Sequence, residues 1–205
     1  MYNGSMPKDE VVLRVSSKKD PSYVKRVAGA IGWQLREKGY CKIRAVKADA
    51  VNTAIKAVAI TNERLSQAGM TFALDLSFSS ADSGEQKNAS TVIEMIIHEE
   101  EGLSRPVNFV DYRVSGKKSD SKELPKRLSG AISNRVNEKT GVRLRCVGPT
   151  SVYNAVKACC LAKGSVYSNG LQSIVVPSWS NFQPSEDHPP VSFIQIDFWT
   201  TKISV

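Results

Sequence analysis

The stretch Arg113-Val114-Ser115-Gly116-Lys117-Lys118 decides the fold, because it repeats Arg14-Val15-Ser16-Ser17-Lys18-Lys19 from 99 positions earlier. Further matches follow in the same order, with an offset that drifts only to 101. They pair Ala28–Ile31 with Ser129–Ile132, Lys42–Val46 with Arg143–Val147, and Ala54–Ala57 with Ala155–Ala158. A period near 100 residues is the size of a domain and too long for a solenoid repeat. The sequence therefore predicts one small domain, duplicated in tandem.

The composition is that of a globular protein with an uneven basic charge. The chain has 205 residues, of which 41% are hydrophobic and 23% charged, enough for a core in each half. The net charge of +8 divides into +2 for residues 1–105 (15 basic, 13 acidic) and +6 for residues 106–205 (13 basic, 7 acidic). A basic balance favours a polyanionic partner, although by itself it bears on solubility and encounter more than on function.

The cysteines and histidines indicate no metal site. The chain has four cysteines and two histidines, with no CxxC spacing, so the sequence predicts no zinc site and no cofactor. Buried free thiols are typical of a reducing compartment. Because neither a secretory signal nor an apolar run of membrane-spanning length is present, we expect an intracellular protein, cytoplasmic or nuclear, with no membrane partner.

Hydrophobic periodicity predicts the order β-α-β-α-β-β in the first half. Asp20-Pro21 is a helix-start signal and Gly39 a helix-stop signal, with Val24, Val27, Ile31 and Leu35 at helical spacing between them. The second helix is expected from Val51 to near Gly69. The four expected strands are 11–15, 41–45, 72–78 and 91–98, and a polar loop over 79–90 joins the last two.

The second half repeats this order. Its strands are expected near 110–115, 142–146, 174–176 and 194–198, with a loop over Pro177–Pro190. Its helices are expected from near Pro125 and over Val152–Lys163. An acidic linker rich in Gly and Pro separates the halves. We place the first domain at residues 8–99, the linker at 100–107 and the second domain at 108–205.

The joint order of these motifs resembles the Alba chromatin and RNA-binding family. It is similar also to the bacterial stage V sporulation protein S group, which shares the architecture. The resemblance covers residues 12–98 and 112–200. It implies an α+β fold of two tandem βαβαββ Alba-like domains, each with two helices on one face of a four-stranded sheet. Family members work as dimers, so the resemblance also implies that the two copies pack as an internal pseudo-dimer.

The same resemblance implies a nucleic-acid surface at the lysine loop before the first helix of each copy. This loop maps onto Lys18, Lys19, Lys117 and Lys118. A basic residue after the second strand maps onto Lys47, where the second copy has Gly148-Pro149. The arm between the third and fourth strands often carries arginine in the family. Here residues 79–90 contain only Lys87 as a base and residues 177–190 contain none, which speaks against minor-groove insertion.

Elementary electrostatics supports the lysine loops. Backbone N–H groups at a helix start and the helix dipole both favour an anion, and adjacent ammonium groups add to this effect. Such contacts hold phosphates without reading sequence. For one copy a solvated turn is the better explanation of the lysines, but their recurrence at equivalent positions favours binding.

In both copies the strands alternate apolar and polar side chains, and the sheet face that carries the polar side chains is basic. It carries Arg14, Lys42 and Arg44 in the first copy, and Arg113, Arg143 and Arg145 in the second. We count Arg143 and Arg145 as supporting phosphate contacts. Asp75 and Glu94 should share the first face and neutralise it by cross-strand pairing. Phe193 and Trp199 lie beside the second set, either exposed to stack on bases or buried against the other repeat.

No catalytic motif appears, so we expect a protein that is not an enzyme. His98 beside Glu99–Glu101 is explained by a solvated charge run at a strand end, and the Cys159-Cys160 pair by a core-facing helix. The leading hypothesis is a binder of RNA, or of DNA with little sequence preference. The alternative is a protein-interaction or assembly module that kept the fold without nucleic-acid binding. Further homo-oligomerisation stays open.

Overall fold

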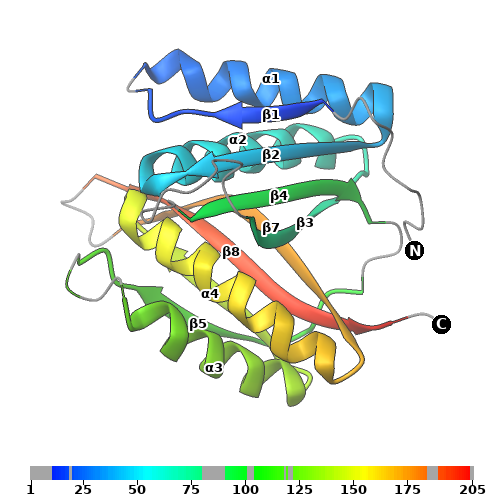
Figure 1. The fold of residues 1–205 in the computed structure, drawn as a ribbon, viewed down its shortest axis with the longest axis vertical. Coiled ribbons are helices and arrows are strands. Elements are labelled where there is room, and N and C mark those ends of the chain that lie inside the picture. Colours follow the sequence, from blue (N-terminus) through cyan, green and yellow to red (C-terminus); the bar gives the residue numbers. More distant parts are fainter. Residues whose placement is uncertain are drawn as a thin grey trace, which may run out of the picture.

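The computed structural model describes residues 11–18, 20–79, 91–100, 104–117, 119, 122–183 and 189–203, and only the backbone of Pro21. The first half contains β1 (Val12–Val15), α1 (Pro21–Lys38), β2 (Tyr40–Val46), α2 (Lys47–Ser66), β3 (Phe72–Ser79) and β4 (Val92–Glu99). The second contains β5 (Phe109–Val114), α3 (Leu124–Asn137), β6 (Gly141–Cys146), α4 (Pro149–Ser168), β7 (Leu171–Phe182) and β8 (Val191–Lys202). The predicted α+β fold with two βαβαββ repeats is thereby confirmed (Figure 1).

Local signals in the sequence determine the ends of α1. Asp20 caps the helix, its Oδ1 accepting the backbone N–H of Ser22 at 2.9 Å. Gly39 ends the helix in the left-handed conformation, with φ of 73°, and its N–H donates to the Leu35 carbonyl. Between these caps the residues at helical spacing, including Val27, Ile31 and Leu35, are buried. Both predicted caps are therefore confirmed.

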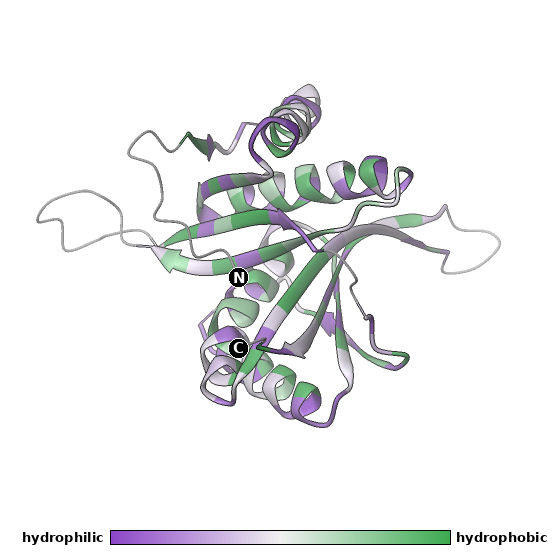
Figure 2. Cartoon of the chain, turned by 90° about the vertical axis from the view of Figure 1, so that its right-hand side faces the viewer, coloured by the Kyte–Doolittle hydropathy of each residue, from purple (hydrophilic) through white to green (hydrophobic). Residues whose placement is uncertain are grey.

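The two sheets have the same strand order, β1-β2-β4-β3 and β5-β6-β8-β7. The first two strands of each sheet are parallel and are joined by a crossover helix, whereas the other pairs are antiparallel. Apolar residues of the strands face the helices, as Cys41, Ile43 and Ala45 do in β2. In Figure 2 the helices carry both hydrophobic and hydrophilic residues, as amphipathic helices on a sheet should.

The halves share one core. The second helices pack against each other, α2 on α4, and β3 lies beside β7. Both second helices are buried on more than one side, since each covers its own sheet and the opposite repeat. Asn62 on α2 spans the junction, because its Nδ2 donates to the carbonyls of Phe72 at 3.2 Å and Pro177 at 3.4 Å. Lys163 on α4 forms an ion pair with Asp75 on β3.

One expectation of the fold was wrong. Residues 177–182 do not belong to a loop, because β7 continues through Pro177 and Trp179 to Phe182. Proline lacks a ladder donor, but β7 is the edge strand of its sheet, where this loss is tolerated. The Pro177 carbonyl accepts from Asn62, and Trp179 packs against the core. Contacts with the other repeat thus extend the strand beyond the point that local residue preferences indicate.

Candidate nucleic-acid interface

All four helices begin on the same side of the molecule, at the left in Figure 1. This follows from topology, since each helix starts where a strand of a parallel pair ends. Lys18 follows β1, Lys117 follows β5 and Lys47 begins α2, so these three lysines lie on this side, and all three are exposed. Lys19 and Lys118, the other two predicted loop lysines, lie outside the described residues.

The first lysine loop is held by Tyr23 of α1. The Tyr23 hydroxyl accepts the backbone N–H of Ser16 at 3.1 Å and the Ser16 hydroxyl at 3.3 Å. Lys18 Nζ lies 5.4 Å from the centroid of the same ring, within the range of a cation–π contact. Partial burial raises the pKa of Tyr23, but the Ser16 hydrogen bonds and the charges of Lys18 and Arg26 outweigh it and lower the pKa overall.

The start of α1 already carries its own anion. Asp20 accepts two hydrogen bonds from the Ser22 side chain and one from the Ser22 backbone, and these bonds lower the pKa of its carboxyl. Arg26 adds an ion pair at 2.8 Å. The N–H groups at this helix start are thus partly used, so an external phosphate would be held here by the lysine ammonium groups.

The second lysine loop rests on α4. Asn154, which is fully buried, donates through Nδ2 to the Ser115 carbonyl at 3.2 Å, and the Lys117 backbone N–H donates to Ser115 Oγ at 3.2 Å. Helix α4 begins after Gly148 with no side-chain cap and with no acidic residue in its first turn. The second loop therefore lies beside a helix start that is available to an anion.

The second helices begin alike in the two repeats. Lys47 and Gly148 are equivalent positions, and both have a positive φ, of 69° and 84°. This conformation suits glycine and strains lysine. Helix α2, like α4, has no side-chain cap. Lys47 thus presents its charge at an uncapped helix start, with Asp49 in the same turn.

Several basic residues on the outer sheet faces have carboxylate partners within the chain. Glu94 pairs with Lys42 at 3.2 Å and with Arg44 at 2.8 Å. Arg145 pairs with Asp111 at 2.9 Å through two hydrogen bonds. The neutralisation expected from Glu94 therefore occurs, whereas Asp75 pairs with α4 of the other repeat instead.

Arg143 belongs to a network around a buried carboxylate. Asp197 is fully buried and accepts from Arg143 at 3.0 Å, from Arg105 at 3.0 Å and from Gln195 at 3.1 Å. Hydrogen bonding to Asp197 raises the pKa of Arg143, although partial burial opposes this. The guanidinium also lies 4.8 Å from the ring centroid of Phe109. Arg143 and Arg145 thus both form ion pairs with carboxylates of their own repeat.

The two aromatic residues considered for base stacking are buried. Trp199 is 1% exposed and Phe193 7%. Trp199 packs with Ala73 of the first repeat and with Ile174 and Val176, and Phe109 meets it edge-on at 6.3 Å between ring centroids. Both side chains are therefore buried, and the expected burial against the other repeat is confirmed for Trp199.

Exposed aromatic side chains occur elsewhere. Trp33 on α1 is 55% exposed, and Phe182 at the end of β7 is 49% exposed. Sequence reasoning did not single them out. For Trp33 a signal existed, because it falls outside the helical stripe formed by Val27, Ile31 and Leu35 and so must face away from the core.

The described residues include no group of three His, Cys, Asp or Glu side chains that could hold a metal ion. His98 Nε2 contacts Glu100 at 2.7 Å at the end of β4. All four cysteines are buried, and burial raises the pKa of Cys41, Cys146 and Cys160 to about 12. Within the described part of the chain, no helix is long and apolar enough to cross a membrane.

With the geometry in place, the chain can be compared with known families. The family model for stage V sporulation protein S matches residues 11–100 and again residues 114–195. The first match spans β1 to β4, and the second runs from the end of β5 into β8, so each repeat contains a match to the family. The chain belongs to the stage V sporulation protein S family. Its expected resemblance to that group and its tandem fold are both confirmed, and the chain carries two stage V sporulation protein S units in one core.

Proposed function

We propose that this protein binds RNA, or DNA with little sequence preference, without catalysis. The lysines at the helix-start side hold backbone phosphates. The leading contacts are Lys18, Lys19, Lys117 and Lys118, with Lys47 beside them. Such contacts use charge and backbone N–H groups, and so they fix the strand without selecting bases.

One contrast within the molecule carries this proposal. Among the described residues, no carboxylate forms an ion pair with Lys18, Lys47 or Lys117, whereas Arg143 and Arg145 on the outer sheet face each have an aspartate partner. The exposed lysines lie at the ends of strands where four helices begin. A positive surface left unneutralised beside helix dipoles is what a phosphate backbone requires.

A charge-matched comparison tests the proposal. One variant replaces the four loop lysines with alanine. The control replaces Arg36, Lys38, Arg64 and Lys202, exposed bases at the opposite ends of the same helices and of β8. In fluorescence anisotropy with a labelled single-stranded RNA, the loop variant should bind about tenfold more weakly than the control. Equal affinities would remove the assignment, because net charge alone would then explain binding.

A protein partner is the second candidate, and one observation favours it. Phe182 and Val191 face each other across the end of the β7–β8 hairpin and are 49% and 41% exposed. An exposed apolar pair is an anchor for a protein surface. Absence of binding to RNA and DNA, together with a partner that survives nuclease treatment and is lost in Phe182→Ser, would establish this function instead.

A further inference from the structure

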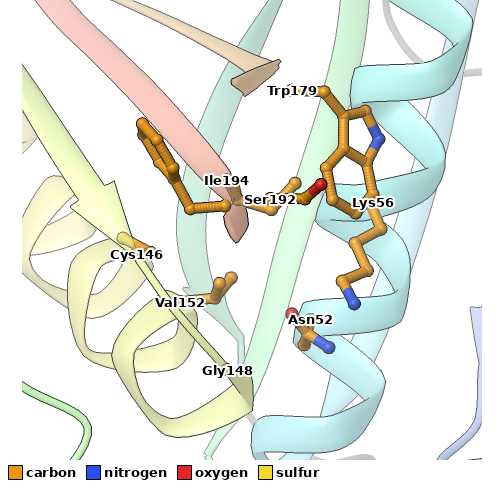
Figure 3. A pocket seen from close by; sticks show the side chains of 9 residues that line it. Asn52, Lys56, Cys146, Gly148, Val152, Trp179, Ser192 and Ile194 are labelled. Carbon is orange, nitrogen blue, oxygen red and sulfur yellow. The ribbon is translucent and has the colours of Figure 1, made fainter. Parts of the chain in front are cut away.

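A small polar cavity lies between the repeats (Figure 3). Its volume is about 40 Å³. Asn52 and Lys56 of α2 line one side, Gly148 and Val152 at the start of α4 another, and Trp179 and Ser192 come from β7 and β8. The cavity thus adjoins the uncapped start of α4, on the side of the molecule where the lysine loops lie.

Residues that line the cavity differ between the repeats. Tyr153 of the second repeat is equivalent to Asn52 of the first, and Lys47 of the first repeat is equivalent to Gly148 of the second. Tyr153 fills its position with a half-buried ring, 5.3 Å from Lys157 Nζ. Two of the residues that line the cavity, Asn52 and Gly148, are thus smaller than their equivalents in the other repeat.

The groups around the cavity define what it can accept. Asn52 is 8% exposed, and its Oδ1 is buried without a hydrogen-bond partner. A buried acceptor of this kind needs a donor. Lys56, held 5.4 Å from the ring centroid of Trp179, supplies positive charge, and no acidic residue lines the cavity in the part of the chain that the structure describes. A matching ligand offers a hydroxyl next to an anionic oxygen.

An RNA strand presents a hydroxyl next to an anionic oxygen at every nucleotide, because the ribose 2′-hydroxyl neighbours the 3′-phosphate. DNA lacks this hydroxyl. The available space suits a hydroxyl, since one water needs about 10–15 Å³. A base would not fit. We propose that the cavity receives a ribose 2′-hydroxyl, which donates to Asn52 Oδ1 while the adjoining phosphate meets Lys56 and the start of α4. This inference rests on the proposed function and selects RNA within it.

The test compares three single strands of one sequence, made of RNA, DNA and 2′-fluoro RNA. The 2′-fluoro strand keeps the RNA sugar conformation but has no 2′-donor. The wild-type protein should bind RNA about fivefold more tightly than either of the other strands, the value of one hydrogen bond. Asn52→Leu should remove this preference for RNA. Lys18→Ala should weaken binding to all three strands by the same factor.

The outcomes separate the inference from the proposed function. Equal binding of RNA and 2′-fluoro RNA by the wild-type protein would overturn the inference, since water alone would then occupy the cavity, and would leave phosphate binding in place. Failure to bind any strand would overturn the proposed function itself. The comparison of strands uses the wild-type protein, so it decides the matter even if Asn52→Leu folds poorly.

Discussion

Lys47 and Gly148 occupy the same place in the two repeats, and both adopt a positive φ at the start of the second helix. Glycine reaches this conformation without strain, whereas a side chain there costs about 1–2 kcal/mol. A charged residue kept in a conformation that glycine prefers is characteristic of a functional position.

Lys47→Gly should therefore stabilise the fold by about 1 kcal/mol and weaken nucleic-acid binding about threefold. Lys47→Ala is the matched control, because it removes the same charge and retains the strain. Urea denaturation and anisotropy titration measure the two effects. If the two variants unfold at the same urea concentration, the backbone strain argued for Lys47 is wrong.

The buried Asp197 carboxylate should be important for stability. Asp197→Asn leaves Arg143 and Arg105 without a charged partner, which should lower the free energy of unfolding by about 3 kcal/mol. Asp111→Asn serves as the control, because the Arg145–Asp111 pair is 44% exposed on both sides and should contribute below about 1 kcal/mol. Similar losses in the two variants would contradict the network described around Asp197.

Tyr23 should act by positioning the first lysine loop. Tyr23→Phe removes the acceptor for Ser16 and keeps the ring beneath Lys18. Because the bonds are exposed, we expect a loss of only about 0.5 kcal/mol in stability and about twofold in RNA affinity. Both losses can be measured in parallel with those of Lys18→Ala, which should weaken RNA binding more than Tyr23→Phe does. Unchanged affinity in Tyr23→Phe would show that the loop needs no such support.

The four thiols should be unreactive in the folded protein. A pKa of about 12 keeps Cys41, Cys146 and Cys160 protonated at pH 8, and burial raises the pKa of Cys159 as well. Since the thiolate is the reactive form, an aromatic disulfide reagent should modify no thiol rapidly before unfolding and four after it. Rapid modification of one thiol under native conditions would contradict the burial of that residue.

Local signals made much of the fold predictable. Asp20 and Gly39 bound α1 through contacts within a few residues, and the alternation in Cys41, Ile43 and Ala45 places β2 with its apolar side on the core. Recurrence of these signals 99 to 101 residues later identified the duplication.

The features missed depend on contacts that are distant in sequence. The extension of β7 past Pro177 uses Asn62, 115 residues away. The burial of Trp199 depends on Ala73 of the other repeat. Likewise, neighbouring residues do not reveal that Asp111 pairs with Arg145, because the first repeat has Val12 at the position equivalent to Asp111. At the site, the lysine loops were visible in sequence, and the cavity beside Asn52 was not.

The salt dependence of binding tests the central claim most directly. Affinity for a labelled duplex DNA and a single-stranded RNA is measured between low and moderate salt, for the wild-type protein and the four-lysine loop variant. If the loop lysines hold four phosphates, the log-affinity against log-salt slope of the wild-type protein should be more negative than that of the variant by about 3 to 4 on the duplex and by about 3 on the single strand. A steep slope that survives loss of the four lysines would contradict the account.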